Sequence, residues 1–302
     1  MDLKSKVILI YGPTASGKSE FAIKLAKKIN GEIINADSMQ VYKELKILSA
    51  RPFSKDYKKI KHHLYGFHSV KKKFSTGDWL KLVNLKIKDI KKRKKIPILV
   101  GGTGLYFKAL TEGLSNIPNI PTKFREKVRS LHSRIGSKNF FLKLIKLDPL
   151  VKKNINSSDT QRVIRAYEIK LFTKKSMYEW FKNTKSKYKE DFFYKIYIDY
   201  PRIDLLKRIN SRTKKMFQKG AILEVKRFIK LNVPKSKSAH KAIGINEIRE
   251  YLLKKIQISH VIEKISIKTR QYAKRQSTWG RGNMSEWNII YASNLNKFLK
   301  KI

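Results

Sequence analysis

The chain has 302 residues, 41% of them hydrophobic, and a formal net charge of +47. This length supports one substantial α/β core and a smaller second lobe, and no apolar run is long enough for a transmembrane helix. Cysteine is absent, which excludes disulfides and cysteine-ligated zinc. Because the sequence also shows no export signal, we expect a cytoplasmic protein that has no contact with a membrane.

The positive charge comes from 70 lysines and arginines set against 23 acidic residues. A surface this basic attracts polyanions, and nucleic acid is the expected partner. The sequence is also rich in residues with AT-rich codons, so genome composition is an alternative origin for many of the lysines. Composition alone leaves both explanations open.

Short apolar runs without alternation indicate buried parallel strands, and helical patterns lie between them. The predicted strands cover residues 6–11, 31–35, 96–100, 194–200 and 286–292. Strands that alternate with helices predict a parallel sheet with helices on both faces.

One interval, residues 121–195, contains no convincing buried strand before its last residues. Its pattern is helical and heavily charged. We therefore predict an inserted helical domain over 121–195, with residues 1–120 and 196–302 forming the α/β core.

The first predicted strand runs into "GPTASGKS", which fits the phosphate-loop pattern G-x-x-x-x-G-K-[ST] between a strand and a helix. Glycines let the backbone amides curl around phosphate, and Lys18 adds a positive charge near the terminal phosphate. The Ser19 hydroxyl is placed to bind Mg²⁺. The predicted phosphate-binding residues are Gly12, Pro13, Thr14, Ala15, Ser16, Gly17, Lys18 and Ser19. The loop by itself does not distinguish ATP, GTP or another pyrophosphate compound.

Asp37 is the best-placed carboxylate, just after the second predicted strand. The third strand ends in "GGTG" without an acid, and Asp199 is a weak candidate for the usual magnesium-binding acid of a nucleotide hydrolase. Ligands of parallel sheets lie at the carboxyl ends of the strands, which brings Asp37 to the edge where the phosphate loop lies. Asp37 there could accept a proton from a nucleophile or could cap the next helix, and spacing does not separate the two roles.

Motifs along most of the chain resemble those of the tRNA dimethylallyltransferases. These are "GPTASGKS", "NADSMQVY", "HHLYGF", "FSTGDW", "LVGGTGLYFKAL", "DTQRVIRAYEI", "RINSRTKKMFQKG", "AIGINEI" and "KTRQYAKRQSTW", in the family's order. The resemblance implies a phosphate-loop NTPase-like α/β fold with an inserted helical tRNA-binding domain. It also implies transfer of a dimethylallyl group from dimethylallyl diphosphate to N6 of the adenosine 3′ to the anticodon, with release of diphosphate and with Mg²⁺ as cofactor.

The resemblance further implies roles for individual residues. Asp37 would be the general base, Arg212 would stabilise the leaving diphosphate, and Thr103 would lie at the catalytic site and meet the tRNA. The implied contacts with the anticodon stem-loop are Asp37, Ser38, Met39, Gln40, Thr103, Arg125, Gln161, Arg162, Val163, Ile164 and Arg165. Ser19 stands where the family more often has threonine, and either hydroxyl can bind Mg²⁺. The chain lacks the C-terminal Cys₂His₂ extension of the eukaryotic enzymes, so we expect the short bacterial type, acting as a monomer.

The sequence also predicts roles for several residues outside these motif assignments. Lys268, Gln271 and Arg275 share one face of a predicted helix that could meet RNA, whereas Trp279 is expected to pack in the core rather than stack on a base. The adjacent pair His62 and His63 is expected to be structural.

A small-molecule or nucleoside kinase that uses ATP is the main alternative function. A non-enzymatic RNA-binding protein is a second, which the intact motif residues disfavour.

Overall fold

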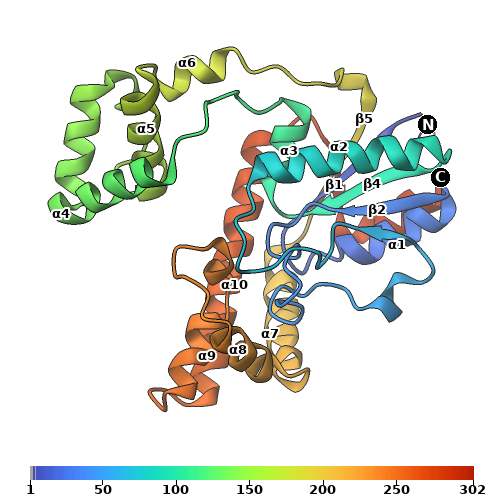
Figure 1. Cartoon of the computed structure of the whole chain (residues 1–302). Coiled ribbons are helices and arrows are strands. Elements are labelled where there is room, and N and C mark those ends of the chain that lie inside the picture. Colours follow the sequence, from blue (N-terminus) through green and yellow to red (C-terminus); the bar gives the residue numbers. More distant parts are fainter. Residues whose placement is uncertain (1–2, 4) are drawn as a thin grey trace. The chain divides into compact units, whose positions relative to one another are not determined.

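The computed structural model describes Leu3 and residues 5–302. It divides into two compact units, one formed by Met1–Ala109 with Tyr188–Ile302 and the other by Leu110–Lys187 (Figure 1). No helix of the described residues combines the length and apolar character that crossing a bilayer requires.

The first unit is built on a six-stranded parallel sheet with the order β3-β2-β4-β1-β5-β6. The strands are β1 (Val7–Tyr11), β2 (Gly31–Asn35), β3 (His62–His63), β4 (Ile96–Gly101), β5 (Phe193–Asp199) and β6 (Asn288–Tyr291). The five predicted strands and their parallel arrangement are confirmed. The edge strand β3 was not predicted, because two residues are too short to give a periodic signal.

Alternate residues of the central strands face opposite sides of the sheet, and both sides are covered, as expected for a parallel sheet. On one side, Ile8 and Ile10 of β1 pack with Phe21 and Leu25 of α1. On the other, the Tyr11 ring meets Phe107 edge-on, with ring centroids 5.7 Å apart. The helices of this unit are α1 (Lys18–Lys28), α2 (Thr76–Lys92), α3 (Gly104–Thr111), α7 (Arg202–Gln218), α8 (Ala221–Lys230), α9 (Ile245–Leu252), α10 (Ile258–Asn283) and α11 (Leu295–Lys300), α3 running on to the first residues of the second unit.

The second unit is helical, with α4 (Thr122–Leu147), α5 (Thr160–Thr173) and α6 (Met177–Lys182) around a core of their own. Its limits lie several residues before the predicted 121 and 195. Ile120, just ahead of the predicted start, is buried in the helical core. At the other end the Tyr188 hydroxyl donates to Asn84 Oδ1 of α2 at 2.9 Å, and β5 begins at Phe193. The last residues of the predicted insertion therefore belong to the α/β unit.

The two adjacent histidines have structural partners at the sheet edge. His63 Nε2 lies 2.6 Å from Oε2 of the buried Glu32, and the His62 ring stacks on Tyr57 with centroids 3.9 Å apart. Burial lowers the pKa of both imidazoles. Across the described residues, no cluster of three or more His, Asp or Glu side chains is arranged to hold a metal.

Candidate active site

The carboxyl ends of the parallel strands meet at one edge of the sheet, where ligands of such folds bind. The phosphate loop follows β1, Asp37 follows β2 and the Gly101–Gly104 loop follows β4. A cavity of about 620 Å³ opens there, wholly within the α/β unit. Its lining includes Thr14, Ala15, Gly17, Lys18, Ser19, Asp37, Ser38, Met39, Gln40, Arg208, Arg212, Tyr272 and Arg275.

The phosphate loop is a tight turn that leads directly into α1. Ala15 and Gly17 have positive φ values of 66° and 82°, and the Ser16 amide donates to the Pro13 carbonyl at 3.2 Å. A left-handed backbone at two nearby residues turns successive amides toward one point, which suits an anion. The Ser16 hydroxyl is buried and has no hydrogen-bond partner among the described residues. The loop's shape is therefore supported by contacts within its own backbone.

Lys18, Arg212 and Asp37 are three of the charged residues that line this cavity. The Lys18 ammonium donates to the Pro13 carbonyl at 3.0 Å, and Arg212 Nη1 donates to Thr14 Oγ1 at 2.9 Å. Burial lowers the pKa of Lys18 to about 8; the Asp37 charge raises it and the Arg212 charge lowers it. Burial also lowers the pKa of Arg212. An anion bound between these cations would favour their charged forms.

The Asp37 carboxylate is oriented by the backbone around it. Its Oδ1 accepts from the Met39 amide at 2.9 Å and from the Gln40 amide at 3.4 Å, while its own amide donates to Asn35 Oδ1 at 2.9 Å. No hydrogen bond reaches its Oδ2 from any residue that the structure describes. The two predicted roles of Asp37, capping and proton acceptance, are thus compatible. Oδ1 caps a turn, while Oδ2 is left for a ligand.

Thr103 joins the glycine-rich loop to the Asp37 segment. Its Oγ1 accepts from the Ser38 amide at 2.9 Å and donates to Ser38 Oγ at 3.3 Å. A side chain on Gly101 would collide with the Ala36 carbonyl, which lies 2.0 Å from the position of a Cβ. The glycine here therefore serves close packing of two loops.

Gln276 of α10 is a functional candidate that the sequence analysis missed. Its Oε1 accepts from the Thr14 amide at 2.8 Å, and its Nε2 donates to the Gly102 carbonyl at 2.8 Å. It thus ties the phosphate loop to the glycine-rich loop. Helical spacing places it on one face with Tyr272 and Trp279, a signal that was present but indistinguishable from ordinary core packing.

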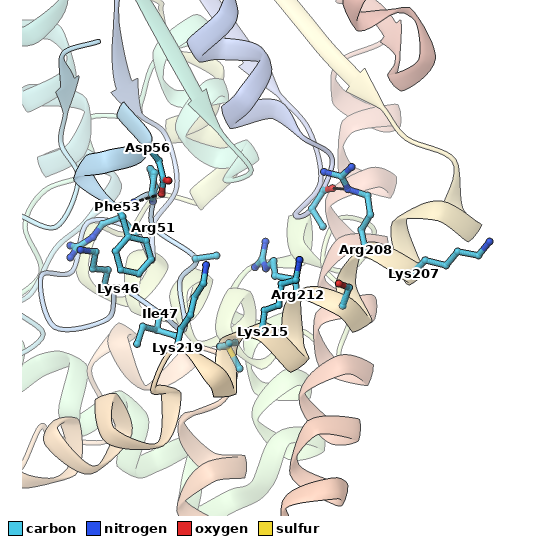
Figure 2. Close-up of a pocket in the computed structure, with 15 residues that line it drawn as sticks. Lys46, Ile47, Arg51, Phe53, Asp56, Lys207, Arg208, Arg212, Lys215 and Lys219 are labelled. Carbon is cyan, nitrogen blue, oxygen red and sulfur yellow. Dashed lines mark hydrogen bonds between the residues drawn. The ribbon is translucent and has the colours of Figure 1, made fainter. Parts of the chain in front are cut away.

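Arg208 is a second missed candidate, one helical turn before Arg212 on α7. Its Nε donates to the Ala15 carbonyl at 2.8 Å, and its guanidinium lies over the Tyr200 ring, 5.3 Å from the centroid. Figure 2 shows Arg208 and Arg212 projecting from α7 toward the loop. The i, i+4 spacing of the two arginines is the signal by which the sequence could have indicated the pair.

The α10 residues that the sequence analysis singled out separate into different environments. Lys268 forms an ion pair with Glu247, Gln271 is exposed and Arg275 lines the cavity. Trp279 is half-buried, and its ring occupies the space that a side chain on Gly104 would need. The expected packing role of Trp279 agrees with this contact.

In the helical unit, a single buried carboxylate organises several arginines. Glu168 lies 3.6 Å from Arg125 Nε, 3.2 Å from Arg165 Nη1 and 4.0 Å from Arg129 Nε. The carboxylate is almost fully buried, whereas the three arginines keep between about a third and just over half of their side chains exposed. Three guanidiniums around one carboxylate leave a net positive patch, which suits RNA phosphates.

The remaining predicted tRNA contacts lie along α5. Arg162 is 69% exposed and pairs with Asp159 at 3.4 Å, and Gln161 is also exposed. Ile164 is half-buried, and Val163 is buried in the core of the unit. Their roles toward tRNA stay predictions, and only the exposed members present side chains for direct contact.

A parallel sheet with this loop after its first strand, and with helices on both faces, defines a phosphate-loop NTPase-like α/β protein. The family model described as IPP transferase matches residues 40–283. A tRNA dimethylallyltransferase of Pelagibacter ubique is 56% identical over 302 residues, covering 100% of this chain and 96% of that protein. The corresponding protein of Rickettsia massiliae is 44% identical, covering 99% and 83%.

Two solved structures are similar along nearly the whole chain. The tRNA isopentenylpyrophosphate transferase of Bacillus halodurans is 30% identical with a TM-score of 0.70, covering 98% of this chain and 95% of that one. A eukaryotic dimethylallyltransferase acting on tRNA is 28% identical with a TM-score of 0.81, covering 97% and 75%. The chain therefore belongs to the tRNA dimethylallyltransferase family of enzymes, and the expected relationship to bacterial members is confirmed.

Proposed function

We propose that this enzyme transfers the dimethylallyl group of dimethylallyl diphosphate to N6 of the adenosine 3′ to the anticodon of tRNA. The observation that carries the proposal is that one cavity is lined by Lys18, Arg212, the phosphate loop and Asp37, whose carboxylate has one oxygen bonded to a backbone amide. The family membership supports the same reaction. A monomeric state and a cytoplasmic location stay predictions.

The donor half of the reaction uses the cations. As the bond between the prenyl carbon and oxygen breaks, negative charge gathers on the departing diphosphate. Lys18, Arg212 and the loop amides stabilise that charge, each by on the order of 2–4 kcal/mol in a site from which water is excluded. Arg208 and Gln276 hold the loop in the required shape through its backbone.

The acceptor half uses Asp37. The lone pair of an exocyclic amine is delocalised into the purine, so N6 attacks the prenyl carbon poorly without help. The carboxylate takes the proton from N6 as the new C–N bond forms, which contributes roughly 10²- to 10⁴-fold. The adenosine must leave the stack of the anticodon loop to reach the cavity.

The residues fit a role for Mg²⁺. Ser19 lines the cavity, and the described residues hold no multi-carboxylate cluster that would bind the ion alone. Mg²⁺ commonly takes one or two protein ligands and completes its shell with phosphate oxygens and water. Ser19 and the donor diphosphate would hold it, and when bound it would add positive charge at the leaving group.

The proposal is tested by incubating the protein with dimethylallyl diphosphate and unmodified tRNA, followed by mass analysis of the nucleosides. We expect dimethylallyl adenosine from the position 3′ to the anticodon and release of diphosphate. Tight ATP binding with phosphoryl transfer, and no prenyl label in tRNA, would instead support the kinase alternative.

Affinity for the diphosphate donor should fall as pH rises through about 8. Lys18 binds the anion when it is charged, and its pKa in the free protein is about 8 rather than the ordinary 10.5. The charged form predominates below that pKa, so the loss begins about 2.5 pH units earlier than for an ordinary lysine, the difference between 10.5 and 8. Isothermal titration of the donor between about pH 7 and pH 10 measures this. In Lys18→Arg, whose guanidinium stays charged, the decline should vanish; an unchanged decline would assign it to another group.

Binding of tRNA should weaken steeply with salt. Counterion release makes the affinity fall by at least about tenfold between about 50 and 200 mM salt if several phosphates are contacted. Filter binding with unmodified tRNA measures the slope, and Arg162→Gln should make it shallower by roughly one counterion. A flat response would place the charge excess away from the RNA.

A further inference from the structure

A second cavity, of about 600 Å³, lies against the phosphate loop between α7 and the 46–56 segment (Figure 2). It adjoins the active-site cavity and shares five lining residues with it, which are Ala15, Ala50, Arg208, Arg212 and Met216. Its ionisable lining residues are Lys46, Arg51, Asp56, Lys207, Arg208, Arg212, Lys215 and Lys219, which are seven cations and one carboxylate.

Two of the lysines converge on one aromatic ring. Lys46 Nζ lies 4.1 Å and Lys219 Nζ 5.5 Å from the centroid of Phe53. The backbone of Phe53 is held in place, because the Phe53 amide donates to Asp56 Oδ2 at 2.8 Å. Cation–π contacts of this kind are favourable, but they do not remove the repulsion between two ammonium groups.

The nearby carboxylates are hydrogen-bonded to backbone amides rather than paired with the lysines. Over the described residues, no carboxylate forms an ion pair with Lys46, Lys215 or Lys219. Asp56 is engaged with the Phe53 amide, and Glu224 accepts from the amides of residues 46, 47 and 48 at 2.8, 2.8 and 2.9 Å. Arg51 donates to the carbonyls of residues 42 and 43. With seven cations against one carboxylate in its lining, the pocket therefore carries a net positive charge.

We propose that this pocket is a second phosphate site, which takes inorganic diphosphate beside the loop that holds the donor. The inference rests on the proposed function, whose reaction releases that anion. A small polyanion fits better than a nucleotide, because the lysines already lie over the Phe53 ring, the one aromatic surface of the pocket on which a base would stack. Arg208 and Arg212, which line both cavities, place the second site next to the leaving group.

Titration calorimetry with inorganic diphosphate on the RNA-free protein tests the proposal. We expect two diphosphates per chain in the wild type and one in Lys46→Gln/Lys219→Gln. Lys214→Gln is the matched control, since Lys214 is exposed on the same helix as the pocket residue Lys215 and lines neither cavity, and it should keep both sites. Lys18→Ala should lose the loop site and keep the second. Circular dichroism verifies that each variant is folded.

Binding of one diphosphate by the wild type, or of two by the folded double variant, would overturn the second site. So would a double variant that loses affinity for an anticodon stem-loop at unchanged diphosphate stoichiometry, because the pocket would then be an RNA contact. The proposed function is judged separately by prenyl transfer in the wild type. If the wild type binds two diphosphates but transfers no prenyl group, the second site is supported and the proposed function is contradicted. If it transfers the prenyl group but binds one diphosphate, the proposed function is supported and the second site is contradicted.

Discussion

Replacing Asp37 with asparagine should lower kcat by about 10²- to 10⁴-fold and leave the KM for tRNA nearly unchanged. The amide oxygen can still accept from the Met39 and Gln40 amides, so the turn is kept while the basic oxygen is lost. Single-turnover prenyl transfer with saturating donor measures the effect.

Asp37→Ala is the informative comparison for this prediction. It removes both the base and the acceptor of the turn, so tRNA affinity should also fall in that variant. If Asp37→Asn turns over at a rate near that of the wild type, Asp37 is not the general base. If both variants lose tRNA affinity equally and lose nothing else, Asp37 is a positioning residue.

Replacing Arg212 with glutamine should lower kcat/KM for the donor by on the order of 10²- to 10³-fold. The guanidinium donates a hydrogen bond to Thr14 in the phosphate loop, and Arg212 lines the same cavity as Asp37. We therefore expect the guanidinium to stabilise the negative charge that develops as diphosphate leaves. Steady-state kinetics with varied dimethylallyl diphosphate measure the loss.

Lys214→Gln provides the matched control for Arg212, because it removes an exposed charge from the same helix outside both cavities. It should leave kcat/KM for the donor within about twofold of the wild type. A defect in Arg212→Gln that appears only in the KM for tRNA would contradict the proposed role at the leaving group.

The features predicted correctly from the sequence are those encoded by local pattern. The strand, glycine turn and helix around Lys18 follow one another within a few residues, and uninterrupted apolar runs marked the buried strands. Gln276 was missed because its role depends on α10 packing against loops more than 170 residues earlier in the chain. The limits of the helical unit were misplaced because tertiary contacts of Ile120 and Tyr188, rather than composition, decide which unit they join.

The bridge made by Gln276 also bears on the order in which the enzyme becomes competent during synthesis. The Thr14 amide and the Gly102 carbonyl leave the ribosome long before their shared partner, and β5, which pairs with β1, follows only after the helical unit has been made. A nascent chain can fold its helical unit early, because the contacts of that unit are local. The donor pocket, by contrast, closes only after nine-tenths of the polypeptide has been translated.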